Sequence, residues 1–166
     1  MRLTSNLRGF AAALLASACL LTQAPLRADP PAAKPDPSAA KVQRLLKAAG
    51  YDYTSKSDTV WYVMKHGDKL GDFKVIGANE GDLLVVFVTI ARKDNIEMDL
   101  DLAKKMLSLN NDLDQVKIGI DNDGDAFVRT DISVRILDQD AFKAVVEQVA
   151  ASAEETYGAI QPYLAK

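Results

Sequence analysis

The amino-acid sequence predicts an α+β fold of the order α-βββ-α-ββ-α, in which one antiparallel sheet is packed by helices. Segments with helical spacing of apolar residues occur at the start, the middle and the end of the folded part. Strand-like segments lie between them in groups of three and two, joined by short turns rich in Gly, Asn and Asp. Because the helices do not alternate with single strands, we expect the sheet to be antiparallel rather than parallel.

The composition is that of one soluble globular domain. The chain has 166 residues, of which 48% are apolar, and it carries 20 basic and 23 acidic residues. It lacks the bias of collagen-like, coiled-coil or disordered proteins and the basic excess of a nucleic-acid-binding protein. The single Cys cannot form a Cys-rich zinc site. The single His offers little acid–base chemistry near neutral pH.

Residues 1–28 have the pattern of a secretory signal peptide. Arg2 and Arg8 precede the uncharged stretch 10–21 (FAAALLASACLL), which is too short to span a membrane. We expect cleavage after Ala28, which would place the mature protein in the periplasm or outside the cell. Residues 29–38 (DPPAAKPDPS) contain four Pro and predict an extended linker. The folded domain is therefore expected over residues 39–166.

A second cleavage site stays open. Residues 16–19 (Ala-Ser-Ala-Cys) form a degenerate lipobox, and cleavage there would leave Cys19 as a lipid-anchored first residue. We favour cleavage after Ala28, because Ala16 stands where a lipobox carries a leucine-like residue. A lipid anchor at Cys19 is therefore not expected.

The first helix and the first three strands follow the linker. Ser38 is a suitable N-cap, apolar residues recur at helical spacing over residues 42–49, and Gly50 suits the C-terminal end. The strands are expected over residues 59–65, 72–78 and 83–90. The last is apolar at every position except Thr89, which predicts a central strand covered on both faces.

A second helix, a hairpin and a third helix complete the fold. Asp99 is expected to cap a helix that ends near residues 110–111, and Asp138 is expected to cap a long helix that Pro162 ends. Between them, residues 116–120 and 126–130 form two strands around the turn at residues 121–125.

The acidic turn is the most conspicuous candidate for a metal site. Asp121, Asp123 and Asp125 offer oxygen ligands at alternate positions, which suits calcium. The calcium loop of an EF-hand, however, needs Gly at its sixth and Glu at its twelfth position, where this chain has Ala126 and Ile132. We favour a hairpin turn that uses Asn, Asp and Gly for its backbone conformation, so these residues stay weak metal candidates.

No catalytic set is found in the sequence. His66 has no Cys or second His to share a metal, and no G-x-S-x-G segment accompanies it. The carboxylates of Glu97, Asp99 and Asp101 suit the positive end of a helix better than a glycosidase pair. Nucleotide-binding glycine motifs do not occur. We therefore expect a protein that is not an enzyme and carries no cofactor.

Four aromatic residues are the weak candidates for a partner surface. Tyr51, Tyr53, Trp61 and Tyr62 lie close together in the sequence. Alternation along a strand puts Trp61 and Tyr62 on opposite faces of the sheet, so one of them points away from the core unless both faces are covered. Exposed aromatic residues often mark binding surfaces, although packing in the core is the favoured interpretation here.

Three features of the sequence occur together: residues 50–53 (Gly-Tyr-Asp-Tyr) after the first helix, residues 109–111 (Leu-Asn-Asn) closing the second, and the hairpin over residues 116–130 before the long last helix. With them the chain resembles the YbjN family, which shares the fold of type III secretion chaperones. The resemblance covers residues 40–163. It implies an α+β domain without catalytic residues that binds protein or peptide segments and often self-associates.

The sequence thus predicts an exported, non-enzymatic domain that recognises a protein or peptide partner in a chaperone-like or regulatory role, with a homodimer as an open possibility. Export departs from the family, whose members are mostly cytosolic. The alternative is a small-molecule or calcium-binding envelope protein that uses a pocket between sheet and helices or the acidic turn. A hydrolase with an unrecognised site is the weakest interpretation.

Overall fold

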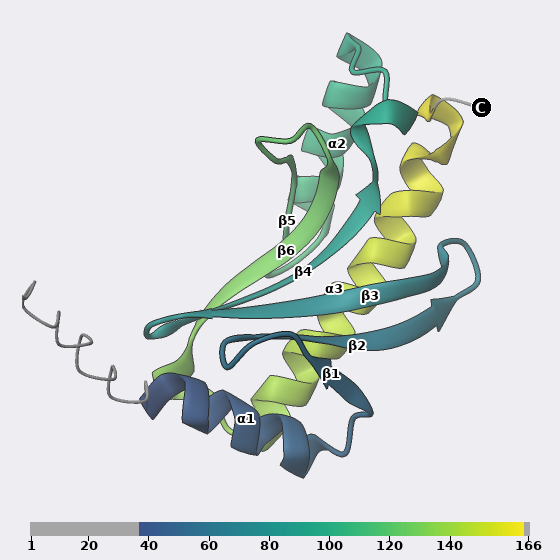
Figure 1. Ribbon diagram of the computed structural model, residues 1–166. Helices are drawn as coiled ribbons and strands as arrows, with labels where there is room; N and C mark the ends of the chain where they lie inside the picture. Colours follow the sequence, from purple (N-terminus) through teal and green to yellow (C-terminus); the bar gives the residue numbers. More distant parts are fainter. Residues whose placement is uncertain (1–36, 165–166) are drawn as a thin grey trace, which may run out of the picture. The chain divides into compact units, whose positions relative to one another are not determined.

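The computed structural model describes residues 37–164, which form three helices and one six-stranded antiparallel sheet (Figure 1). This confirms the predicted α+β class. The predicted signal peptide and most of the linker lie outside the described residues. The helices are α1 Pro37–Ala49, α2 Leu100–Asp112 and α3 Gln139–Ile160. The strands are β1 Tyr53–Ser55, β2 Val60–Gly67, β3 Gly71–Glu80, β4 Leu83–Ala91, β5 Lys117–Ile120 and β6 Ala126–Ser133.

The helix ends follow local side-chain chemistry. The carboxylates of Asp99 and Asp138 each accept a hydrogen bond of 2.8 Å, from the backbone amides of Leu102 and Ala141, which confirms both predicted N-caps. The first helix differs from the prediction, because it begins at Pro37 and includes Ser38. Proline suits a first helical position, since its fixed φ matches the helix and its missing N–H would have no partner there.

The sheet order is β1-β2-β3-β4-β6-β5, and every neighbouring pair is antiparallel. The five predicted strands are present, and each has at least one end that differs from the prediction by one to three residues. The short strand β1 was not predicted, because its three residues are too few to show a periodic pattern. It pairs with β2 along one edge of the sheet, with Tyr53 opposite Val63.

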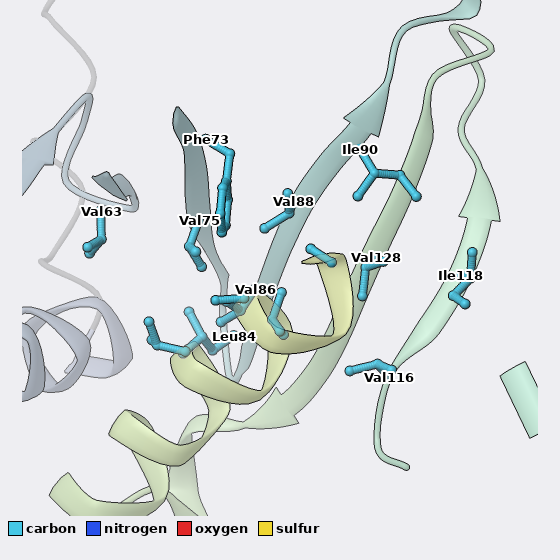
Figure 2. Close-up of a cluster of buried hydrophobic side chains, with 14 of the residues drawn as sticks. Val63, Phe73, Val75, Leu84, Val86, Val88, Ile90, Val116, Ile118 and Val128 are labelled. Atoms are coloured by element: carbon cyan, nitrogen blue, oxygen red, sulfur yellow. The ribbon is translucent and has the colours of Figure 1, made fainter. Parts of the chain in front are cut away.

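The core lies between one face of the sheet and α3 (Figure 2). Helices α1 and α2 both pack against α3, so the helical layer is on that side of the sheet. Phe142, Val146 and Val149 of α3 are fully buried. The buried strand residues on the same side are Trp61, Val63, Phe73, Val75, Leu84, Val86, Val88, Ile90, Ile118 and Val128.

Trp61 is held in this core by a glycine on the neighbouring strand. Its ring centroid lies 5.7 Å from that of Phe142, and its exposed fraction is 3%. Gly77 pairs with Trp61 across β2 and β3. A Cβ atom at Gly77 would lie 2.1 Å from Cζ2 of the Trp61 ring, so the indole occupies the space of the missing side chain.

Candidate functional site

The other face of the sheet carries apolar residues but no helical layer. We call this surface the open face. On the central strand β4, Val85, Phe87 and Thr89 point toward it, opposite to the buried Val86 and Val88. The prediction that this strand is covered on both faces is therefore wrong for residues 37–164. In this part of the chain, helices pack on one face of the sheet. Val85 is buried, with an exposed fraction of 6%, and Phe87 is half-buried. The open face consists of Tyr62, Met64, Ile76, Val85, Phe87, Thr89, Phe127, Arg129 and Asp131.

Charged groups border the apolar part of the open face. Lys56 and Lys74 lie 5.4 and 4.9 Å from the centroid of the Tyr62 ring, within the range of a cation–π contact. On β6, Asp131 accepts hydrogen bonds from the guanidinium of Arg129 at 2.7 and 3.0 Å and from the ammonium of Lys117. These donors, Arg129 first, hold the pKa of the Asp131 carboxyl below its usual value. An apolar centre with a charged border is the common anatomy of a protein interface.

A cleft opens between the central strands. The hydrogen-bonded register of β3 and β4 joins residues 76–80 to residues 83–87 and ends at Ile76 and Phe87. Beyond that point β3 pairs only with β2, and β4 only with β6. Figure 1 shows the two strands diverging from their shared hairpin, with α3 crossing behind them. A cavity of about 910 Å³ occupies this divergence.

Both sheet faces and the end of the last helix line the cleft. Lys74 and Thr89 belong to its two walls on the open-face side, and Phe73 and Ile90 on the core side. Tyr157 of α3 and Leu164, which bridges to Ile96, add apolar surface. The remaining lining residues are Met64, Leu70, Asp72, Ile76, Ala91, Arg92, Asn95 and Gln161.

The structure does not bring the four predicted aromatic residues onto one surface. Trp61 lies in the core, whereas Tyr62 lies on the open face, as strand alternation requires. The Tyr51 hydroxyl donates a 2.8 Å hydrogen bond to Glu147 of α3. Burial, and then this contact with Glu147, raise the pKa of Tyr51 above its usual range. Tyr53 is half-buried against the core. Of the four, Tyr62 alone contributes to the open face.

The acidic turn is accounted for by hydrogen bonds within the protein. The Asp121 carboxylate accepts from the backbone amides of Asp123 and Asp125, both at 2.9 Å. Asp125 accepts from the Lys93 amide at 3.0 Å and from Arg92 at 2.6 Å, and these contacts lower the pKa of its carboxyl. Over residues 37–164, three or more His, Cys, Asp or Glu side chains are nowhere grouped to hold a metal ion.

His66 belongs to an exposed ion pair. Its Nδ1 lies 2.7 Å from Oδ1 of Asp72, and the two side chains are 76% and 77% exposed. The hydrogen bond to Asp72 raises the pKa of His66. The pair joins facing residues of β2 and β3, so it links the two strands at one end of their hairpin.

Comparison with known proteins places this fold in a family. The sequence model of the YbjN family, described as "putative bacterial sensory transduction regulator", matches residues 38–162. The chain belongs to the YbjN family. The resemblance noted in the sequence is thereby confirmed, and the family match covers nearly all of the described YbjN domain. No curated protein sequence matches the chain.

Solved structures share the fold of this YbjN domain at low sequence identity. YbjN from E. coli is 15% identical, with a TM-score of 0.57 over 76% of this chain and 95% of that chain. The ExsC–ExsE complex matches with 16% identity and a TM-score of 0.53 over 72% and 93% of the two chains. The heterodimeric ExoU–SpcU complex from the type III secretion system of Pseudomonas aeruginosa matches with 14% identity and a TM-score of 0.52 over 74% and 97%. The likeness to these structures is one of fold.

Sequence reasoning missed the open face and the cleft. The apolar residues at positions 83–90 were recognised, but the sequence does not show whether the helices cover one face of the strand or both. The cleft has no local signal, since it depends on where two strands stop pairing.

In the described part of the chain, no helix is both long and apolar enough to cross a membrane.

Proposed function

We propose that this YbjN domain is an exported, non-enzymatic binding domain that receives a protein partner on the open face of its sheet. The observation that carries the proposal is the central strand β4, which is apolar on both sides but covered by helices on one side. A partner would supply the second layer.

The chemistry of the open face supports this function. Met64 is 51% exposed, and Ile76, Phe87 and Phe127 on the same face are half-buried. Methionine and aromatic side chains are enriched at interfaces because they bury large apolar areas and adapt their shape. Lys74, at the border, favours a partner with acidic residues around an apolar centre.

Proteins of similar fold favour the same kind of role. The ExsC–ExsE and ExoU–SpcU structures are each complexes between two proteins. Catalytic residues form no part of the proposal, because His66 is engaged with Asp72 and the acidic turn with its own backbone.

The binding surface is tested by a matched pair of substitutions. The tagged protein is used to capture partners from the envelope fraction of its own host, and each bound protein is identified by mass spectrometry. Met64→Glu places a charge on the open face and should abolish capture. Ile136→Glu changes an apolar residue that is 72% exposed outside the open face and should preserve it. Equal loss in both variants, or retention in both, would contradict the proposed surface.

Export is tested by the mass of the mature chain. The order of charged, apolar and small residues in positions 1–28 supports cleavage after Ala28. We therefore expect protein isolated from the envelope to begin at Asp29. An acylated Cys19, or an uncleaved chain in the cytoplasm, would contradict this assignment. The same native mass spectrum reports whether the protein is a homodimer.

A small-molecule-binding envelope protein is the second candidate function, and the cleft is the observation that favours it. Its volume of about 910 Å³ lies within the range of ligand pockets, roughly 300–1,000 Å³. A ligand that binds only the folded protein raises its melting temperature. A thermal-shift screen of metabolites and of calcium is expected to give no shift if the cleft receives polypeptide instead.

A further inference from the structure

We infer that the cleft between β3 and β4 receives an extended segment of the partner as an inserted β-strand, which pairs with both walls at once. This inference rests on the proposed function and specifies how the partner is held.

Among the described residues, the backbone of each wall has no hydrogen-bonding partner across the cleft. Extending the register that joins Ile76 to Phe87 would place Lys74 opposite Thr89, the last residue of β4 before a bulge shifts its register against β6. In the structure these residues are not paired with each other, and within residues 37–164 the backbone groups of the two walls have no alternative bond across the cleft. The N–H and C=O groups of alternate residues in a strand point to the same edge. Those of Lys74 and Thr89 are therefore directed into the opening.

Two unpaired edges that face one another require a particular occupant. A strand added at the outside of a sheet pairs on one side only, whereas a strand in the cleft pairs on both. The stretches without pairing across the cleft are residues 71–75 of β3 and 88–91 of β4, and alternate residues within them face the opening, with the bulge between Thr89 and Ala91 at the far end of β4. At about 3.3 Å per residue, this matches an extended segment of roughly 15 Å. The cavity of about 910 Å³ provides the space.

The lining specifies the side chains of the inserted segment. Residues of the segment that point toward α3 would meet Phe73, Ile90 and Tyr157, so apolar residues fit there. Residues that point outward would meet the ammonium group of Lys74, the carboxylate of Asp72, which is already paired with His66, and the mixed rim of the open face. Alternation along a strand then predicts a segment in which apolar residues alternate with acidic ones.

The occupant is a segment of another protein rather than a second copy of this domain. The edge strands β1 and β5 are already paired on one side, so neither can pair with two walls. Residues 29–38 of the chain contain four Pro, and proline has no N–H to donate to a neighbouring strand. A loop or terminus of the partner, free on both edges, meets the requirement.

Alternately N-methylated peptides test the insertion. The probe is a capped nonapeptide of alternating Val and Glu, and its affinity for the complete chain is measured by fluorescence anisotropy. Two further peptides carry N-methyl groups on the odd or on the even amides. An inserted strand uses both sets of amides, so each methylated peptide should bind at least tenfold more weakly. If the peptide paired with the edge of the sheet, only one of the two methylated peptides would bind more weakly. If it lay across the open face, both methylated peptides would bind as well as the parent peptide. Either result would overturn the insertion.

Hydrogen exchange and a charge pair locate the bound peptide. The amides of Lys74 and Thr89 should become at least tenfold more protected on binding. Lys74→Glu should weaken binding at least tenfold, whereas Lys104→Glu, the same change on the exposed surface of α2, should leave it unchanged. Absence of binding by the alternating peptide, or binding without protection at these two amides, overturns the inference. The proposed function fails separately, if Met64→Glu leaves partner capture intact.

Discussion

Gly77→Ala provides a direct test of the contact that holds Trp61 in the core. The added Cβ would lie 2.1 Å from Cζ2 and 2.2 Å from Cε2 of the indole, far inside van der Waals contact. The ring cannot withdraw easily, because its exposed fraction is 3% and Phe142 packs against it. The substitution therefore forces a shift of the ring or of the β2–β3 pairing.

The expected cost follows from opposing contributions. Overpacking a buried site destabilises the fold by about 1–3 kcal/mol. Replacing Gly by Ala in a strand stabilises it by roughly 0.5–1 kcal/mol, because Ala has less conformational entropy in the unfolded chain. Combining these two ranges gives a net loss of about 0–2.5 kcal/mol in the free energy of unfolding, and we expect a value near the middle, about 1 kcal/mol. The melting temperature should fall by roughly 3–10 °C in a domain of this size.

The assay is a double-mutant cycle read by urea denaturation. With Trp61→Leu in the background, the space beside Gly77 opens and Gly77→Ala should cost about 0.5 kcal/mol or less. Gly119→Ala is the matched control, because its cross-strand neighbour Phe127 is half-exposed and can turn aside. Additivity of the Trp61 and Gly77 changes within about 0.5 kcal/mol would refute the reasoning. So would a larger cost at Gly119 than at Gly77.

Three further outcomes can be measured on the same purified protein. Asp131→Asn should flatten the dependence of the unfolding free energy on pH between about pH 5 and pH 2. The carboxyl has a lowered pKa in the folded state, so it stabilises the fold above its unfolded pKa and loses that contribution as the pH falls. An unchanged slope would contradict a stabilising contact between Asp131 and Arg129. Asp99→Ala should cost about 1 kcal/mol in urea denaturation through the lost cap on Leu102, and a change below a few tenths would contradict the cap. Asp121→Ala should lower the melting temperature by a few degrees, because the turn loses hydrogen bonds that contribute roughly 1 kcal/mol. The decrease should be the same with and without millimolar calcium. A difference that depends on calcium would support a metal site at this turn.

Local chemistry in the sequence was sufficient to predict most of the elements. Asp99 and Asp138 were recognisable as N-caps because each is followed by an apolar stripe at helical spacing. The turn at residues 121–125 was recognisable because Asn, Asp and Gly favour its backbone conformation, and Gly124 has a φ of 90°. These features depend on residues within one or two turns of each other, so a single sequence contains the necessary information.

Features that depend on distant residues could not be predicted in the same way. Strand alternation placed Trp61 and Tyr62 on opposite faces, but it could not say which face holds the core. The answer depends on Gly77 and Phe142, which lie 16 and 81 positions further along the chain. The point where β3 and β4 stop pairing is likewise set by how each strand follows its other neighbour, and no residue near Ile76 indicates it.

The clearest disagreement between sequence and structure lies on β4, and it coincides with the candidate site. Val85 and Phe87 are the residues of a strand buried on both sides, yet within residues 37–164 no helix covers their side of the sheet. Apolar residues retained on an uncovered face carry a risk of aggregation unless something covers them in use. The same strand leaves residues 88–91 unpaired toward β3. One strand therefore lacks both its second layer and part of its second neighbour, and a single partner segment that enters the cleft and extends over the open face would supply both.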